Sequence, residues 1–514
     1  MIVEAKNLPA DITALREIIY KQNEIIQRKN FEIKELRKIV YGHRTEKRSA
    51  EDIRQGLLFN EAEHTKAKAK AVETSTVKSH SRKKRGRKPI PDHLPVKETI
   101  HDLPEDQKTC DCGKKLHRIG EDVTKELHFI PARLEVEKHI TYKYACRTCE
   151  GADSIDKPGV LINKPKRLLP GSIASPSLLT YIIVSKYKDA LPLYRLEGIF
   201  KRLQIRISRT SMANWMIRVS EKLSDLKEML FEELDASPVV SMDETPLQVL
   251  KEPGRAAQSK SYMWCARNYE KNPIVIYHYS PSRSSTVINE VLPNFSGILL
   301  SDGYAAYAAA SKDGRFVNAG CHVHARRNFI QAAEEGSPDA QYIISLYALM
   351  FQVEAHAKRR ARSYEQLLKL RQRVSKPLFA KILDHCKSRL PETFGASPIG
   401  KAYRYVLKFE KALCVFLEQP NVPMDNNRTE NDIRPFVIGR KNWLFSDSPA
   451  GANASSFWYS IIETAAQNGH NVSEYLLYLL SHYPQLKTRE EKYAILPHVL
   501  DPKKTTAAAE TLQG

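Results

Sequence analysis

The change in local residue pattern after Pro238 constrains the fold of this 514-residue chain more than any other feature. Short runs of β-forming residues bounded by turn residues begin there, and they predict strands. These runs cover residues 239–242, 262–266, 273–279, 297–300 and 315–317. Helical patterns follow over residues 325–419, then short strands around residues 440–445 and a helix over residues 458–467. Strands followed by a long helical block predict an α/β core with a helical insertion.

Two of the predicted strands end in an acid. Asp243 follows the hydrophobic run 239–242, and Asp302 follows the run 298–301. Each acid alone is equally consistent with an ordinary turn residue. Two strand-end acids in one small sheet can instead converge on a divalent cation, because Mg²⁺ binds a few carboxylates together with water and phosphate oxygens.

A third acid is needed to hold two metal ions for displacement at a phosphodiester. Glu430 is the candidate, since polar capping residues precede it early in a predicted helix and Arg434 follows one turn later. The alternative is that Glu430 is a surface glutamate. Glu463 is the competing third acid, because it lies in a helix flanked by apolar residues and could be partly buried.

The charge balance points to nucleic acid as the partner. The chain has 80 Lys and Arg against 60 Asp and Glu, a formal net charge of +20. No apolar run approaches the roughly 18 residues needed to cross a bilayer. The first six residues lack the basic start and apolar core of a signal peptide. We expect a cytoplasmic protein without a membrane partner.

A basic segment ends a linker of polar composition. Seven of the eleven residues 78–88 are Lys or Arg, and Arg85-Gly86-Arg87 resembles an AT-hook core that fits a narrow minor groove. The alternative is a solvated linker held near phosphates by charge alone. Both interpretations place DNA here, and the expected contacts are Arg82, Lys83, Lys84, Arg85, Arg87 and Lys88.

Residues 12–40 carry a heptad repeat. The a positions are β-branched, namely Ile12, Ile19, Ile26, Ile33 and Val40. β-Branched a positions with Leu at some d positions favour a parallel dimer. The alternative is one amphipathic helix packed on its own protein. The pattern therefore predicts a homodimer or a higher oligomer.

Four cysteines form two close pairs, Cys110 with Cys112 and Cys146 with Cys149. Two pairs separated by a short module are typical of a tetrahedral Cys₄ zinc site, although the first pair has only one intervening residue. Four thiolates leave no open position, so a zinc ion bound here would be structural.

The residue pattern over 170–235 predicts helices. Ser175 and Ser208 are expected N-caps, and a turn over residues 202–207 separates two of the helices. This arrangement fits a helix-turn-helix but equally any helical hairpin. Further basic side chains could contact phosphates or be surface charge, and they are Arg326, Arg327, Arg434, Arg440 and Lys441. Residues 358–376 hold eight Lys or Arg and one Glu, which indicates a DNA-tracking face or a solvated helix.

These residues together match a known family. The relevant stretches are residues 119–123, 169–172, 243–246, 301–304, 321–327, 425–430 and 439–445, beside the heptads and the cysteine pairs. Over nearly its whole length the chain resembles the DDE transposases of the IS66 group of bacterial insertion sequences. It departs from the family pattern at Glu430-Asn431, where Glu-Arg is usual, and at Cys110-Asp111-Cys112, where Cys-x-x-Cys is usual.

The resemblance implies a ribonuclease-H-like core with Asp243, Asp302 and Glu430 as the metal triad. It implies two active-site Mg²⁺ or Mn²⁺ ions, structural Zn²⁺, and double-stranded DNA as partner, both element ends and target. It also implies a nucleoid-associated bacterial protein, with small accessory proteins of the same element as further partners. Two rival functions stay open: a non-catalytic DNA-binding protein derived from a transposase, and a metal-dependent nuclease without strand transfer.

The expected organisation has six segments. They are a coiled coil (1–45), a basic linker (46–91), a zinc module (92–160), a helical region with a helix-turn-helix (161–235), the catalytic domain (236–475, with its insertion at about 325–424) and a C-terminal tail (476–514).

Overall fold

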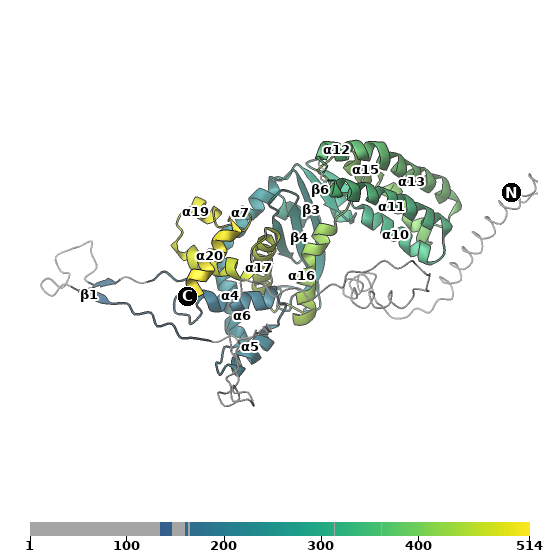
Figure 1. Cartoon of the computed structure of the whole chain (residues 1–514). Helices are drawn as coiled ribbons and strands as arrows, with labels where there is room; N and C mark the ends of the chain where they lie inside the picture. The colour runs from purple at the N-terminus through teal and green to yellow at the C-terminus, as the bar shows by residue number, and fades with distance from the viewer. Residues whose placement is uncertain (1–133, 146–159, 163–164, 313, 361, 514) are drawn as a thin grey trace, which may run out of the picture. The chain divides into compact units, whose positions relative to one another are not determined.

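The computed structural model describes residues 134–145, 160–162, 165–312, 314–360 and 362–513 (Figure 1). The predicted coiled coil, basic linker and most of the predicted zinc module lie outside these residues. Strands β1 (Lys143–Ala145) and β2 (Val160–Ile162) form a small antiparallel pair. Within the described ranges, no helix is long and apolar enough to cross a membrane.

Four helices follow this pair: α4 (Pro176–Tyr187), α5 (Leu193–Arg202), α6 (Arg209–Lys222) and α7 (Ser224–Asp235). Both predicted N-caps are confirmed. The Ser175 hydroxyl accepts a hydrogen bond from the Leu178 amide at 3.2 Å, and the Ser208 hydroxyl accepts one from the Ser211 amide at 3.1 Å. Each cap satisfies an amide that the first helical turn leaves without a backbone partner.

A five-stranded sheet follows, with strand order β5-β4-β3-β6-β7. Its strands are β3 (Val239–Gln248), β4 (Lys260–Asn268), β5 (Val275–Ser280), β6 (Ile298–Ser301) and β7 (Val317–Gly320). β3, β4 and β5 are antiparallel neighbours, whereas β6 and β7 run parallel to β3. All five predicted strands are confirmed as elements, with β7 displaced toward the C-terminus of its predicted run.

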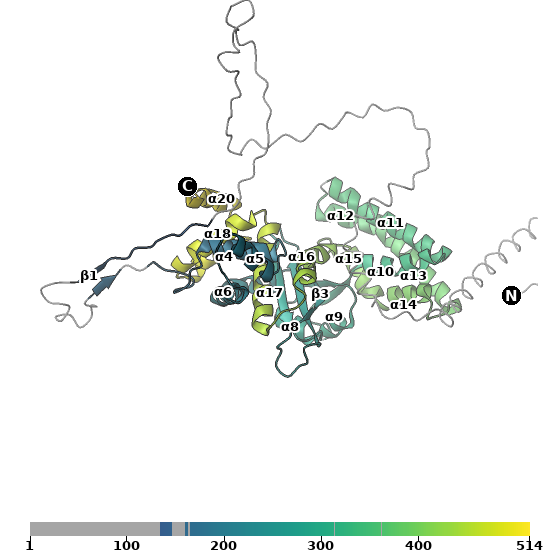
Figure 2. The same cartoon turned by 90° about the horizontal axis from the view of Figure 1, so that it is seen from below.

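One face of the sheet packs against the C-terminal helices. Asp243, Cys265 and Tyr277 are cross-strand neighbours on β3, β4 and β5, so their side chains point to the same face. The Tyr277 ring lies 6.4 Å from Phe436 of α16 (Asn427–Trp443) and 5.3 Å from Tyr459 of α17 (Pro449–Gln467). In both views these two helices lie against the strands (Figures 1 and 2). Asp243 therefore shares its face with α16.

The opposite face carries Glu244 and Trp264, which are also cross-strand neighbours. Trp264 contacts Tyr307 of α9 (Ala305–Ala310) with ring centroids 6.1 Å apart. His278 contacts Phe231 of α7 at the same centroid distance, 6.1 Å. A short helix, α8 (Thr286–Val291), lies before β6 in the chain. Alternation along β3 thus directs two consecutive acids to different environments.

The helical pattern predicted over residues 325–419 is confirmed. It comprises α10 (His322–Glu334), α11 (Pro338–Arg359), α12 (Tyr364–Leu370), a π-helical turn (Arg371–Ser375), α13 (Lys376–Arg389), α14 (Pro398–Lys408) and α15 (Glu410–Glu418). These helices enclose a core of their own, which also takes in Val239, Leu300 and Ala319 from the sheet. The block is therefore packed against the strands through shared buried side chains.

The strands predicted around residues 440–445 are wrong, because α16 continues to Trp443. Its buried residues Ile433, Phe436 and Val437 follow helical spacing, so β-branched residues here serve a helix face. The helix predicted over residues 458–467 is confirmed and begins earlier, at Pro449.

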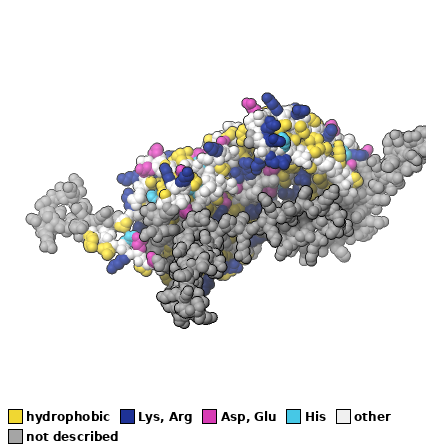
Figure 3. Space-filling view, in the orientation of Figure 1, with side chains coloured by type: hydrophobic (Ala, Val, Ile, Leu, Met, Phe, Trp, Pro, Cys, Tyr) yellow, Lys and Arg dark blue, Asp and Glu magenta, His cyan; other side chains and the backbone are white. Residues whose placement is uncertain are grey.

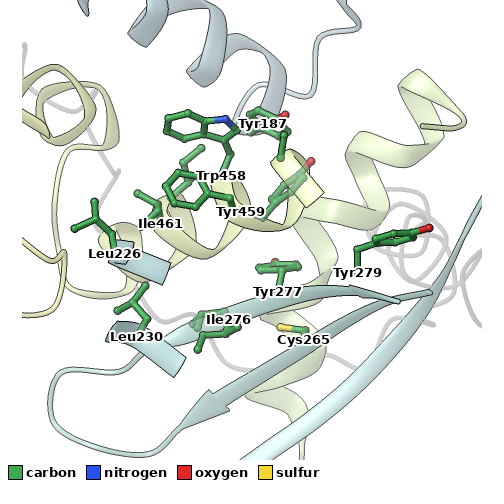
Figure 4. Packing of buried hydrophobic residues seen from close by; sticks show 14 of the residues in the cluster. Tyr187, Leu226, Leu230, Cys265, Ile276, Tyr277, Tyr279, Trp458, Tyr459 and Ile461 are labelled. Atoms are coloured by element: carbon green, nitrogen blue, oxygen red, sulfur yellow. The ribbon is translucent and has the colours of Figure 1, made fainter. Parts of the chain in front are cut away.

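Helix α17 completes the edge of the sheet. The hydroxyls of Ser460 and Thr464 accept hydrogen bonds from the β5 amides of Tyr277 (2.7 Å) and Val275 (3.0 Å). These contacts satisfy backbone groups that an edge strand would otherwise expose. Figure 4 shows the aromatic side chains of α17 lying above the strands in the buried cluster.

The predicted C-terminal tail contains further packed helices. They are α18 (Val472–His482), α19 (Arg489–Tyr493) and α20 (Pro502–Gln513). Leu476, Leu479 and Leu480 of α18 are fully buried in the same core as α4 and the sheet. The region after residue 475 thus contributes to the folded core.

Candidate active site

Asp243 and Asp302 lie at the same level on neighbouring parallel strands. Ser241 of β3 is paired with Leu300 of β6, and each acid lies two residues beyond one of these partners. Adjacent strands are about 5 Å apart, so the two carboxylates leave the sheet side by side. Asp243 lies within β3, which continues to Gln248, so the prediction that it ends its strand is wrong, whereas Asp302 directly follows β6 as predicted.

A tight turn fixes Asp302. Its carboxylate accepts a hydrogen bond from the Tyr304 amide at 2.9 Å, and its carbonyl accepts one from the Tyr405 hydroxyl at 2.6 Å. Gly303 between them has φ +88°, and a Cβ there would lie 2.7 Å from the Tyr405 hydroxyl oxygen. Only glycine adopts this positive φ and leaves room for the Tyr405 hydroxyl without strain, so the backbone turn after Asp302 requires glycine.

Glu430 is brought to this edge by the first turn of α16. The side-chain cap expected before Glu430 is not formed, since Asn426 at the N-cap makes no capping hydrogen bond. Its side-chain amide instead donates to the carbonyl of Met242 at 3.1 Å, and Met242 directly precedes Asp243. One turn later, the Thr429 hydroxyl is hydrogen-bonded to the Ser241 hydroxyl. Both contacts are buried, and together they set the register of α16 along β3. Glu430 follows directly after Thr429 and is therefore held near Asp243.

A second anchor comes from the start of α10. The Asn426 amide donates to the Cys321 sulfur at 3.3 Å, and the His322 amide donates to the Met424 carbonyl at 3.1 Å. Cys321 is fully buried and directly precedes α10. Cys321 and His322 therefore hold the start of α10 against the segment that leads into α16.

The electrostatics of Asp243 show that the three acids interact. The pKa of its carboxyl is raised well above the usual range, first by burial and then by the charges of Glu244, Asp302 and Glu430. The Glu244 amide donates to the carboxylate at 2.8 Å and partly offsets this rise. Burial also raises the pKa of Asp425, with Glu430 adding to the effect. Such concentrated negative charge is typical of a site for a cation.

Glu244 is a neighbouring acid that sequence reasoning missed. Its side chain, 1% exposed, pairs with Arg283 at 2.7 Å and accepts a hydrogen bond from the Tyr307 hydroxyl at 2.6 Å. The Arg283 guanidinium lies over the Tyr304 ring, 4.0 Å from its centroid. Burial and Asp302 raise the pKa of Glu244, whereas Tyr307 and Arg283 lower it. The strand alternation at Asp243 was the signal that could have placed this acid on the opposite face.

Two basic side chains on α10 lie close to Glu430. His324 Nε2 lies 3.7 Å from one carboxylate oxygen, and Arg327 Nη2 lies 3.4 Å from the other. The two residues are three apart on one helix, so they share a face. The Glu430 oxygen nearest His324 accepts no hydrogen bond from the residues that the structure describes. Arg327, predicted to contact DNA, thus lies at the candidate acid.

The competing acid Glu463 has a different partner. It pairs with Lys188 of the loop after α4 at 3.1 Å, and its side chain is 6% exposed. Burial raises the pKa of Glu463 and Lys188 lowers it. The charges acting on Asp243 are those of Glu244, Asp302 and Glu430, which favours Glu430 as the third member of the group.

The other predicted DNA contacts are spread along α10 and α16. Arg440 donates to the Thr245 hydroxyl at 2.8 Å and to the Pro246 carbonyl, so it joins α16 to β3. Arg326 lies 5.7 Å from the Phe351 ring, and Arg434 is half-buried. Lys441 is exposed. The predicted zinc cysteines and the basic segment 82–88 lie outside the described residues.

The donor set fits a hard divalent cation, although the ligands are not gathered into a closed shell. In the part of the chain that the structure describes, no three His, Cys, Asp or Glu side chains are grouped closely enough to hold a metal ion. A divalent cation would bind the Glu430 oxygen that accepts no hydrogen bond from the described residues, and it would relieve the repulsion between the acids at Asp243.

Comparison with known proteins identifies the chain. Residues 171–454, which include all three acids, match the family model described as "Transposase IS66 family". The chain belongs to this family. It is 31% identical to the uncharacterized protein y4jD of Sinorhizobium fredii, over 74% of this chain and 75% of that protein. It is 29% identical to the uncharacterized protein y4qI of the same organism, over 95% and 92%.

Two further matches cover the N-terminal part of this transposase-family chain. Residues 107–150 match the "zinc-finger binding domain of transposase IS66", a range that contains all four predicted zinc cysteines. Residues 30–99 match the "Transposase C of IS166 homeodomain". These matches support structural zinc and DNA binding for this part of the chain.

Proposed function

We propose that this protein is a DDE transposase, which binds the ends of its insertion sequence and catalyses metal-dependent DNA cleavage and strand transfer. The core is ribonuclease-H-like in this proposal. Three antiparallel strands followed by two parallel strands, with acids on the central strand and its parallel neighbour, support that fold. The observation that carries the proposal is that the charges of Asp302 and Glu430, which come from separate parts of the chain, add to burial in raising the pKa of Asp243.

Asp243, Asp302 and Glu430 would hold two Mg²⁺ or Mn²⁺ ions. When bound, such ions supply activation of the attacking oxygen and stabilisation of the charge that develops on the phosphate. Glu430 would first exchange its contacts with His324 and Arg327 for this role. Arg327 would then bind a phosphate next to the scissile bond, which suits the charge-assisted contacts that Arg makes.

The reaction has two displacements at phosphorus. Water cleaves at the end of the element, and the freed 3′-hydroxyl then attacks target DNA in the same in-line geometry. Neither step needs a covalent protein–DNA intermediate, so we assign no Ser or Tyr nucleophile. The role of the chain is to position DNA and to concentrate negative charge where the ions bind.

The remaining segments would supply DNA binding and assembly. α5 and α6 form the helix-turn-helix region, residues 82–88 contact the phosphate backbone or minor groove, and Cys110, Cys112, Cys146 and Cys149 hold structural zinc. The heptads of residues 12–40 would join two chains, as an enzyme that pairs two DNA ends requires. Small accessory proteins and association with the nucleoid belong to the same proposal.

The decisive experiment is a cleavage and joining assay on the full chain. A labelled duplex carrying one end of the element is incubated with Mg²⁺ and a target plasmid, with Asp243→Asn as the matched control. Cleaved and joined products, absent for Asp243→Asn, are the expected result. Cleavage without joining would identify a nuclease, and DNA binding without either product would identify a non-catalytic DNA-binding protein.

A further inference from the structure

The helical block carries a dense basic surface. Seven Lys and Arg side chains between the end of α11 and the start of α13 are exposed: Lys358, Arg359, Arg360, Arg362, Lys369, Arg373 and Lys376. We call these residues the 358–376 surface. In Figure 3, Lys and Arg side chains gather over α12 and the neighbouring end of α11. The surface lies away from the acids in sequence and is not used by the chemistry proposed above.

Little acidic charge balances this surface. Glu365 is the exposed acid within the same stretch of the chain. Among the described residues, none of the seven cations forms an ion pair with a carboxylate, and Arg359 donates only to the carbonyl of Ala355 in its own helix. By comparison, the exposed Lys251 is paired with Asp447 at 2.8 Å. Unpaired cations that lie close together repel one another, and an anionic partner bound to this surface would relieve that repulsion.

The eighth cation of the stretch, Arg371, points inward and is 1% exposed. It is bonded to both carboxylate oxygens of Glu354, at 2.8 and 2.9 Å. It also donates to the carbonyls of Phe416 (2.8 Å), Gln419 (3.1 Å) and Val422 (3.0 Å). The Phe416 carbonyl belongs to the last turn of α15, and the other two belong to the loop between α15 and α16. The π-helical turn that begins at Arg371 thus fixes the basic surface to the chain that carries Glu430.

We propose that the 358–376 surface binds the phosphate backbone of duplex DNA, as a contact separate from the active site and from the N-terminal basic segment. This inference rests on the proposed transposase function for its biological meaning. Duplex DNA fits better than a protein partner, because the surface is dominated by charge, whereas the centre of a protein interface is depleted of charged residues. Backbone contacts of this kind position a duplex without reading its sequence.

The test is the salt dependence of DNA binding by the full chain. A fluorescein-labelled duplex of about 40 base pairs with arbitrary sequence is titrated without metal, at several NaCl concentrations. The slope of log K against log salt becomes shallower by about 0.9 for each phosphate that the protein no longer neutralises. The triple variant Lys369→Gln, Arg373→Gln, Lys376→Gln should therefore reduce the slope by about 2 to 3 and weaken binding about tenfold or more.

The matched control is the triple variant Lys271→Gln, Lys503→Gln, Lys504→Gln. It removes the same formal charge from exposed positions elsewhere and should leave the slope near that of the unsubstituted chain. Equal melting temperatures for all three proteins would show that the fold is intact. A slope for the first variant equal to that of the control, or no binding by the unsubstituted chain, would overturn the inference. The assay contains no metal, so a failure of cleavage or joining cannot be mistaken for a failure of this surface.

Discussion

The assignment of the third acid is tested by comparing two isosteric variants, Glu430→Gln and Glu463→Gln. Each replaces one carboxylate by an amide of the same shape, so packing is nearly unchanged. Glu430 acts on Asp243 through its charge, and one of its carboxylate oxygens accepts no hydrogen bond from the described residues. Glu463 forms an ion pair with Lys188 at 3.1 Å.

The expected magnitudes differ because the two carboxylates are in different environments. Glu463→Gln should cost about 1 kcal/mol of stability or less, since Lys188 is 36% exposed and the amide oxygen can still accept its hydrogen bond. Cleavage should then change by less than about threefold. Glu430→Gln removes a charge needed in the transition state, so a loss of about 10³-fold or more in cleavage is expected, equivalent to about 4 kcal/mol.

The assay combines single-turnover cleavage and joining in Mg²⁺ with DNA binding and melting temperature. Both variants should bind DNA nearly normally, because binding rests on Lys and Arg contacts with phosphates. Glu430→Gln should behave like Asp243→Asn and Asp302→Asn. If Glu430→Gln retained activity while Glu463→Gln lost it, the reasoning would be refuted and Glu463 would belong in the triad.

Three further outcomes are expected. Asp432→Ala should lower the free energy of unfolding by about 3–5 kcal/mol in chemical denaturation, because it leaves the buried Arg267 without its carboxylate partner. The pair spans 2.6 Å, and its side chains are 5% and 1% exposed. The double variant Arg267→Met, Asp432→Leu should recover part of that loss. Because the pKa of Asp243 is raised in the folded protein, the stability of the metal-free protein should fall as the pH rises from about 4 through that pKa. Melting curves of Asp243→Asn should lack the part of this fall that ionisation of Asp243 causes. Replacing Cys146 and Cys149 with Ser should release zinc and weaken DNA binding, and metal analysis that found no zinc in the reduced native protein would contradict it.

The elements that could be predicted from sequence are those with local causes. Alternating β-rich runs bounded by turns were enough to find the five strands, and a serine before a helical pattern was enough to place the caps at Ser175 and Ser208. The strand predicted around residues 440–445 failed for the opposite reason. Residues 440–443 instead form the last turn of α16, where the Trp443 ring lies 5.5 Å from that of Phe436, so tertiary packing overrode the local propensity.

Part of the candidate site could be predicted, because acids next to the strands of one small sheet can lie close together. The sequence pattern put both acids at strand ends, which is correct for Asp302 but wrong for Asp243, because β3 continues to Gln248. Their nearness follows from the parallel register of β3 and β6. Glu244 could not be assigned a partner in the same way. Its contacts with Arg283 and Tyr307 depend on the loops before α8 and after β6, and no local pattern specifies how such loops pack.

The position of Glu430 relative to the sheet could not be predicted from the local sequence. A cap-like sequence can place an acid in the first turn of a helix, but the face of the sheet that this helix covers depends on contacts between residues far apart in the chain. Those contacts are Asn426 with the Met242 carbonyl and Thr429 with Ser241. Each is a buried polar group that would cost about 1–3 kcal/mol if left unsatisfied, so α16 cannot slide along β3 without losing both. A one-turn shift would carry Glu430 away from Asp243, and the polar side chains before the acid are therefore as necessary to the site as the acid itself.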